Sequence, residues 1–271
     1  MRDERRWSTY VCVVTGASRG IGLATVKALE QRGATVVRLG RDPLRNAVAC
    51  DLGSFDSIRA AAVEIAARWP RVDLLVNNAG VQHVRRTLSA DGFEATFAVN
   101  HLAPFLLTRL LMPRLEAAPR ARVVTVSSSL CRWGRIAFDD LQGRHRYNGT
   151  RAYLQSKLAN IMFTASLADR LARSTISAVC VYPGLVTTDL LRERWWWRAA
   201  WLRPLWRAIF LAPDNAAQAV LGAATLPAPA NDPPCCFTLG GRLVAAPSRA
   251  RDGEARRRLW NETVRLVGVD F

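Results

Sequence analysis

The sequence predicts an α/β fold, a doubly wound parallel sheet of about seven strands flanked by helices. Two patterns support this prediction. Short runs rich in β-branched residues alternate with longer stretches of helical period, which is typical of βαβ units, and a glycine-rich loop follows the first predicted strand. Half of the 271 residues are hydrophobic, so the chain can bury a sizeable core.

The first half of the chain alternates regularly between strands and helices. Gly33 ends the first predicted helix, because glycine readily takes the conformation that closes a helix. The stretch 42–48 is too short for a crossover helix and is predicted to be a loop or a single turn. Pro104 should bend the long third helix, since proline lacks the N–H of the helical ladder. Strands are expected at 11–15, 35–39, 49–51 and 73–77, and helices at 21–31, 57–68 and 93–116.

The second half begins with the same alternation and ends with an insertion. A strand is predicted at 122–128, a helix at 152–172 and a strand at 177–182, followed by a Trp-rich insertion at about 190–212. Beyond it we expect a helix capped by Asp214, a last strand near Phe237 and a C-terminal helix from about Asp252. Because no linker or internal repeat interrupts the chain, residues 1–271 are predicted to form a single domain.

The charge balance is strongly basic. Lysine and arginine together number 38 against 22 acidic residues, a net charge of +16, and only Lys27 and Lys157 are lysines. Such a field favours nucleic acid, an anionic membrane surface or an anionic cofactor. The arginines are scattered and form no basic tail or aromatic-interleaved motif. A compositional bias therefore explains them better, and we expect no nucleic-acid partner.

Cysteine usage and hydropathy bear on the cellular compartment. The six cysteines form no C-x-x-C pair, and no histidine stands at metal-ligand spacing, so we expect no metal site and a reducing compartment. No apolar run reaches the roughly 18 residues of a membrane-spanning helix. The start MRDERRW lacks the apolar stretch of a signal peptide. The expected location is the cytoplasm.

The loop between the first strand and the first helix has the glycine spacing of a dinucleotide-phosphate site. Gly16 permits a tight turn, Gly20 lets the backbone approach a pyrophosphate, and Gly22 allows close packing of helix on strand. The helix start offers unpaired N–H groups to the anion. An ordinary glycine-rich turn is the alternative, but the strand-loop-helix context favours a Rossmann-type cofactor site. Its expected contacts are Gly16, Ser18, Arg19, Gly20, Ile21 and Gly22.

The end of the second strand indicates which nicotinamide cofactor is preferred, because the adenosine ribose reaches that point. Arg41 stands there, and an arginine pairs with the 2′-phosphate of NADP, whereas an acid would bind the 2′-hydroxyl of NAD. Arg19 points to the same phosphate. NADP(H) is the predicted cofactor, and NAD(H) stays open because Arg38 and Arg41 also fit the general arginine excess.

Residues after the third and fourth strands complete the predicted adenosine side. Asn78, Ala79 and Gly80 can pack against the adenine and its ribose, or form a structural turn. Asp51, followed by Leu52, can receive the adenine amino group, although an aspartate at a strand end also caps helices. These residues are expected cofactor contacts, each with its structural alternative.

Tyr153 and Lys157 are the strongest catalytic candidates. Their i,i+4 spacing places them on one face of a helix. The ordinary pKa of a phenol is about 10, and a neighbouring ammonium lowers it, so Tyr153 can serve as general acid and base. Ser128, at a strand end, can hydrogen-bond the reacting oxygen while hydride passes between carbon and nicotinamide. A solvated helix face is the alternative for Tyr-x-x-x-Lys alone, but the glycine loop and Ser128 accompany it in the right order.

Together these motifs resemble the short-chain dehydrogenase/reductase superfamily. The resemblance covers nearly the whole chain and rests on TGASRGIG, NNAG, Asn100, VSS ending at Ser128, YLQSK and PGLVTT. It implies a catalytic tetrad of Asn100, Ser128, Tyr153 and Lys157, in which Asn100 holds a water in a proton relay and Lys157 also binds the nicotinamide ribose. The cofactor contacts that it adds are Tyr153, Lys157, Pro183, Gly184, Val186 and Thr188, with Val186 and Thr188 facing the carboxamide.

FDDLQ, YLQSKLANIMFT and RRRLWNETVRLVG are similar to the retinol dehydrogenase branch of that superfamily, whose members mostly prefer NADP. In this superfamily a substrate lid follows the PGLVTT stretch. Here that stretch leads into five tryptophans, which imply a large apolar surface. The insertion is interpreted as a lid over a lipophilic substrate or as core or dimer packing, with peripheral membrane contact third.

The sequence therefore predicts an NADP(H)-dependent oxidoreductase that interconverts a carbonyl and an alcohol on a lipophilic small molecule. Tyr153 is its expected general acid and base. A cofactor-binding regulatory scaffold with little turnover is the alternative function, and a homo-oligomer stays open.

Overall fold

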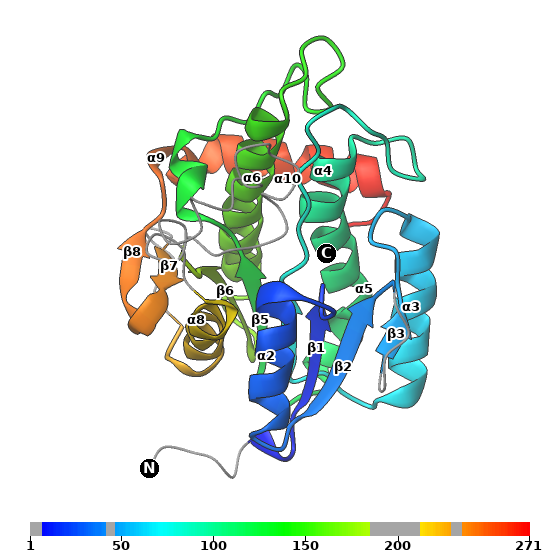
Figure 1. Cartoon of the computed structure of the whole chain (residues 1–271), viewed down its shortest axis with the longest axis vertical. Coiled ribbons are helices and arrows are strands. Elements are labelled where there is room, and N and C mark those ends of the chain that lie inside the picture. The colour runs from blue at the N-terminus through cyan, green and yellow to red at the C-terminus, as the bar shows by residue number, and fades with distance from the viewer. Residues whose placement is uncertain (1–6, 42–46, 185–211, 229–234) are drawn as a thin grey trace, which may run out of the picture.

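The computed structural model describes residues 7–41, 47–184, 212–228 and 235–271 (Figure 1). The described strands join one sheet in the order β3-β2-β1-β4-β5-β6-β7-β8. Their bounds are β1 Val11–Thr15, β2 Thr35–Gly40, β3 Ala47–Ala49, β4 Leu74–Asn77, β5 Ala121–Val126, β6 Ile176–Tyr182, β7 Cys235–Thr238 and β8 Leu243–Ala245. The predicted α/β fold with a doubly wound parallel sheet is confirmed.

Neighbouring strands run parallel from β3 to β7, and β8 returns antiparallel to β7 at the edge. A short turn with positive φ at Gly240 and Gly241 (80° and 77°) joins these two strands. The sequence analysis missed β8, because its three residues are exposed or half-buried and therefore show no buried apolar run.

Helices cover both faces of the sheet (Figure 1). Residues alternate along β1: Cys12 and Val14 pack in one core with α2 and α8, and Val13 packs in the other with α3, α5 and α6. This period of two is that of a strand buried on both faces. The helices named are α2 Gly20–Glu30, α3 Phe55–Arg68, α5 Ala103–Glu116, α6 Gly149–Arg170 and α8 Pro213–Thr225.

Side chains cap several helix starts. Ser54 caps α3 by accepting a hydrogen bond from the N–H of Ser57. The expected C-terminal helix is α10 (Gly253–Val267), preceded by the short α9 (Ser248–Arg251), and Asp252 caps α10. The predicted cap by Asp214 is wrong: Asp214 lies in the first turn of α8, whose start is set by a proline at the first position, where no N–H needs a partner.

The predicted helix 93–116 is built from three pieces: α4 (Ala95–Phe97), the π turn η1 (Ala98–Leu102) and α5. Pro104 was expected to bend a continuous helix from within. It lies instead in the first turn of α5, just after the π turn. In an α-helix residue 104 would donate to the carbonyl of Asn100, and proline has no N–H to donate. The run Ala95–Glu116 has the length and apolar composition of a membrane-spanning helix, but 83% of its most apolar window is buried, as in a core helix.

Candidate active site

The predicted site residues follow the carboxyl ends of the central strands. β1 pairs with β2 on one side and with β4 on the other, so the strand order reverses direction at this point. Open α/β sheets bind ligands in the crevice outside the carboxyl ends at such a switch point. Here β1 ends at Thr15, β4 at Asn77 and β5 at Val126, and each end leads directly into predicted site residues.

The glycine loop after β1 has the backbone of a phosphate-binding turn. Gly16 and Gly20 have φ values of 64° and 56°, which favour glycine. A Cβ on Gly22 would lie 2.1 Å from the carbonyl oxygen of Gly16, so α2 can approach the loop this closely only with glycine there. A Cβ on Gly20 would meet nothing within 4 Å. The loop is thus tightly packed on one side and open on the other.

The first turn of α2 can receive an anion. It holds no acidic residue, and its N-cap residue, Arg19, makes no side-chain capping bond to it. Ser18 and Arg19 are exposed and Ile21 is half-buried. Because a helix N-terminus carries partial positive charge and N–H donors, this turn and the open backbone at Gly20 fit the diphosphate of a dinucleotide.

Thr15 ties the glycine loop to the segment after β4, a role that the sequence analysis missed. Its Oγ1 accepts hydrogen bonds from the backbone N–H of Asn78 at 2.9 Å and of Ala79 at 3.0 Å. In return, Nδ2 of Asn78 donates to the carbonyl oxygen of Thr15 at 2.8 Å. Asn78 therefore braces the two loops. A hydroxyl residue at the end of an otherwise apolar strand was the available clue to Thr15.

Two predicted adenosine contacts, Arg41 and Asp51, are exposed after β2 and β3. By contrast, Arg38 donates to both carboxylate oxygens of Glu30 at 2.8 Å and is thus engaged in an ion pair. The carboxylate of Asp51 accepts the N–H of Gly53 at 2.8 Å, so Asp51 closes a turn and is not the cap of α3. Leu52 is buried beside it.

Lys157 is buried at the centre of the crevice, with 4% of its surface exposed. Its Nζ donates to the carbonyl oxygen of Val126 at 3.0 Å, and Oγ of Ser127 donates to the carbonyl oxygen of Lys157 at 2.7 Å. A Cβ on Gly80 would lie 3.3 Å from Nζ, so glycine leaves room for the amine. Nζ lies 5.8 Å from the centroid of the Tyr153 ring. The structure therefore brings the pair together, and a solvated helix face does not describe Lys157.

Burial dominates the ionisation of this pair. It raises the pKa of Tyr153 to about 12, with a smaller contribution from Cys131, and it lowers the pKa of Lys157 to about 8. The prediction that the pKa of the phenol lies below its ordinary value is wrong for this structure, because burial removes the hydration of the phenolate and so raises the pKa. At neutral pH both side chains are protonated.

Asn100 is fully buried in η1, and its amide is used inside the protein. Oδ1 accepts the N–H of Val81 at 2.8 Å, while Nδ2 donates to the carbonyl of Val81 and to Oγ of Ser156, both at 2.9 Å. Asn100 therefore fixes the segment after β4 and joins it to α6. Its main-chain carbonyl lacks the usual α-helical donor because residue 104 is proline. The water relay implied by the family resemblance stays a prediction.

Ser128 directly follows Val126, the last residue of β5, and Ser127. Both of these residues hydrogen-bond Lys157. Ser128 is 9% exposed and caps the 3₁₀ helix η2 (Ser129–Trp133) by accepting the N–H of Leu130 at 3.3 Å. This helix packs on the start of α6, since a Cβ on Gly134 would lie 2.6 Å from the carbonyl oxygen of Leu154. Ser128 and the amine of Lys157 therefore both lie at the carboxyl end of β5.

The predicted contacts after β6 are described only in part. Pro183 is buried and Gly184 is exposed, with a φ of 93°, directly beyond the carboxyl end of β6. Val186 and Thr188 lie outside the described residues, as does the insertion 190–212 up to residue 211. The carboxamide contacts and the lid therefore stay predictions.

Thiols in the described part of the chain are buried. Burial raises the pKa of Cys50 to about 12 and that of Cys131 to about 11, so these thiols are poor nucleophiles and poor metal ligands. Within the described ranges no group of three His, Cys, Asp or Glu side chains is arranged to hold a metal ion. The free cysteines described are Cys12, Cys50, Cys131, Cys180 and Cys236.

Comparisons with known proteins concern most of the chain. The sequence model of short chain dehydrogenases matches residues 10–199. Retinol dehydrogenase 12 of Mus musculus is 37% identical over 284 residues, which cover 96% of this chain and 87% of the relative. An uncharacterised protein from Mycobacterium Paratuberculosis has a crystal structure with a TM-score of 0.77 and 34% identity, covering 97% of this chain and 95% of that one. A metagenomic short-chain oxidoreductase solved in complex with NADP has a TM-score of 0.58 and 30% identity, covering 80% and 91%.

Proposed function

Since this chain belongs to the short-chain dehydrogenase family and has retinol dehydrogenases among its relatives, we propose that it is an NADP(H)-dependent oxidoreductase that interconverts a carbonyl and an alcohol on a lipophilic small molecule. The observation that carries this proposal is the buried Lys157, whose Nζ lies 5.8 Å from the Tyr153 ring centroid. A lysine is expensive to bury, and here it stands at the sheet edge where the fold binds ligands.

When bound, the nicotinamide supplies or accepts the hydride at the substrate carbon. In the reducing direction Tyr153 donates a proton to the carbonyl oxygen, and its pKa of about 12 keeps that proton available at neutral pH. Ser128 hydrogen-bonds the same oxygen. Lys157 is an ammonium below a pH of about 8, so it can bind ribose hydroxyls and stabilise the negative charge that develops on the phenol.

NADP(H) is proposed over NAD(H) on the strength of two exposed arginines. Arg41, after β2, and Arg19, beside the glycine loop, are exposed and can reach a 2′-phosphate. An arginine pair favours the phosphate because its hydrogen bonds are charge-assisted. Titration with NADPH and NADH tests this choice, and tighter binding of NADH would contradict it.

Replacement of Tyr153 by phenylalanine tests the reaction itself. Tyr153→Phe keeps the ring and removes the proton donor, so turnover with NADPH and a panel of aldehydes, ketones and retinoids should fall by roughly 10²- to 10⁴-fold. The Kd for NADPH should be unchanged. Tyr10 directly precedes β1, at the end of that strand opposite the glycine loop. Tyr10→Phe is therefore the matched control and should keep full turnover. A regulatory scaffold instead predicts no functional effect of Tyr153→Phe and no turnover by the wild type.

We also propose a cytoplasmic location, because the described cysteines are free thiols, as expected in a reducing compartment. Fractionation of cells that produce the full chain tests this. Recovery in the membrane pellet would contradict it and would favour membrane contact through the Trp-rich insertion.

A further inference from the structure

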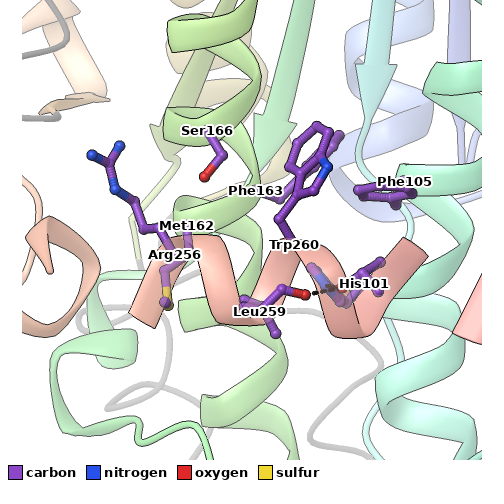
Figure 2. Close-up of a pocket in the computed structure, with 9 residues that line it drawn as sticks. His101, Phe105, Met162, Phe163, Ser166, Arg256, Leu259 and Trp260 are labelled. Carbon is purple, nitrogen blue, oxygen red and sulfur yellow. Dashed lines mark hydrogen bonds between the residues drawn. The ribbon is translucent and has the colours of Figure 1, made fainter. Parts of the chain in front are cut away.

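His101 follows Asn100 in the π turn, and its ring lies in a small hollow on another side of the helix (Figure 2). The ring is 1% exposed, and its centroid lies 5.0 Å from that of Phe97 and 6.4 Å from that of Phe163. Other residues that line the hollow include Phe105, Leu259 and Trp260. A polar ring is therefore enclosed mainly by apolar side chains, where each of its nitrogens needs a partner.

One ring nitrogen of His101 bonds to a neighbouring helix. Nε2 lies 2.9 Å from Oγ1 of Thr263 on α10, which is the dashed contact in Figure 2. Nδ1 of His101 and Oδ1 of Asn160 on α6 are buried polar atoms without a hydrogen-bond partner among the described residues.

One tautomer fits these contacts. A neutral imidazole donates through one nitrogen and accepts through the other. With its proton on Nε2, His101 donates to Oγ1 of Thr263, and the hydroxyl of Thr263 donates to the carbonyl of Leu259 at 2.7 Å. Burial lowers the pKa of His101 to about 4, more than the contact with Asn160 raises it, so the ring is neutral under ordinary conditions.

The helices on either side of His101 are fixed to each other by separate contacts. Arg256 on α10 pairs with Asp169 on α6 at 2.9 Å. The guanidinium of Arg170 on α6 lies 3.7 Å from the ring centroid of Trp260 on α10. The hydrogen bond of His101 therefore joins η1 to α10, and α10 is fixed to α6 by contacts that do not involve His101.

We propose that His101 is a positioning residue. Its hydrogen bond to α10 holds η1 in the register from which Asn100 reaches Val81 and Ser156. A π turn is a less favourable register than an α-helix and is found mainly where function requires it, so it needs such external support. We call the contact between His101 and Thr263 the bridge. Its effect on turnover rests on the proposed function, whereas its effect on the backbone of η1 does not.

Substitutions at Thr263 test the bridge. Thr263→Val keeps the shape of the side chain and removes the hydroxyl, and Thr263→Ser keeps the hydroxyl. In the full chain, hydrogen exchange read by mass spectrometry should become roughly ten-fold faster in segments 79–83 and 98–105 for the valine variant and should stay at the wild-type rate for the serine variant. With NADPH and a carbonyl substrate, kcat should fall about 10- to 100-fold at an unchanged KM for NADPH.

Met162→Ala is the matched control, because Met162 lines the same hollow without bonding to the ring nitrogens. It should destabilise the protein and leave kcat unchanged. Faster exchange confined to α10 in Thr263→Val, or an equal loss of kcat in Met162→Ala, would overturn the proposal. If Thr263→Val does not fold, His101→Phe removes the hydrogen bond to Thr263 while keeping a ring and should give the same pattern. A wild type that turns over no carbonyl would refute the proposed function, and the exchange rates would still decide on the bridge.

Discussion

The amine of Lys157 is removed from water and contacts the backbone carbonyl of Val126, with the Tyr153 ring centroid 5.8 Å away. Its pKa falls to about 8 for that reason, and the pKa of Tyr153 rises to about 12 for the same reason. Below a pH of about 8 both side chains keep their protons, and between about 8 and 12 only Tyr153 does. The pair is therefore suited to give a proton to a carbonyl oxygen at neutral pH, and the ammonium is its more labile member.

The pH dependence of carbonyl reduction should follow Lys157. We expect kcat to fall as pH rises through about 8, where Lys157 loses its charge while the phenol stays protonated. This loss would not reflect unfolding caused by Lys157: its folded pKa lies below the ordinary value of 10.5, so between about 8 and 10.5 the unfolded chain binds more protons and this group adds stability as pH rises. Measuring kcat and the thermal midpoint over the same pH range checks both signs. A kcat that stays constant through pH 10 would contradict the assignment.

Gly22 should tolerate no side chain. Gly22→Ala places a Cβ 2.1 Å from the carbonyl oxygen of Gly16, so α2 or the loop must move. We expect a loss of stability of roughly 1–3 kcal/mol and weaker NADPH binding. Gly222→Ala in α8 is the matched control, since its Cβ would lie 3.8 Å from the nearest atom, in Leu226. It should be neutral or add up to about 1 kcal/mol through helix propensity. Thermal unfolding and NADPH titration measure both variants.

At the scale of the elements, η1 is the irregular part of an otherwise regular fold. It is followed directly by α5, whose second residue, Pro104, cannot donate to the carbonyl of Asn100. The interruption lets consecutive residues serve different partners: Asn100 bonds to Val81 and α6, while His101 bonds to α10. The π turn thus connects the crevice to the far side of the helical layer.

Restoring the missing N–H should weaken this turn. Pro104→Ala lets residue 104 donate to the carbonyl of Asn100 and so favours the α register over the π register. We expect kcat to drop by about ten-fold or more because Asn100 moves. Pro113→Ala, in the exposed part of the same helix, should keep kcat and not lower the stability. A crystal structure of Pro104→Ala that retains η1, or full activity of that variant, would contradict this account.

Most elements could be predicted from the sequence because they follow one rule each. The buried strands are β-branched runs, and the loop of Gly16 and Gly22 has the one spacing that permits close packing. The cap of α8 and the edge strand β8 could not, because Pro213 competed with Asp214 and β8 has no buried run. Prediction failed at the start of α8 because two residues compete there to set the helix start. It failed at β8 because that strand is defined only by its pairing with β7.

Prediction of the site was limited in a different way. The i,i+4 spacing placed Lys157 beside Tyr153 correctly, but the direction of the pKa of the phenol depends on how deeply both are buried, which spacing does not contain. Likewise, Thr15 and Ser156 act through hydrogen bonds between segments far apart in the chain. Residue identity indicated the chemistry, and tertiary packing decided the ionisation.

Over the whole chain positive charge is in excess, with 38 basic against 22 acidic residues. The net charge is +16, and the described ion pairs are mostly at the surface, such as Arg68 with Glu64 and Arg265 with Glu262. Surface pairs of this kind contribute little, so mutual repulsion of arginines should lower the stability of the folded chain.

Screening should therefore stabilise the protein. We expect the thermal midpoint to rise when NaCl is increased from about 20 to about 200 mM, as the Debye length shortens to below about 10 Å. Over the same range NADPH should bind more weakly, because the attraction between its phosphates and the positive field is also screened. Differential scanning calorimetry and cofactor titration at each salt concentration give the two trends. A midpoint that falls with salt would show that ion pairs outweigh the repulsion.

Because the chain has only two lysines, the side chain of Lys157 in the crevice can be observed selectively by spectroscopy. Lys27 is exposed on α2 and Lys157 is buried at the crevice. Feeding isotope-labelled lysine to cells that make the protein would mark these two side chains alone, so their resonances could be distinguished by a single substitution at Lys27. The remaining signal would then report the protonation of the buried amine, and the arrival of a dinucleotide beside it, without any substrate being known.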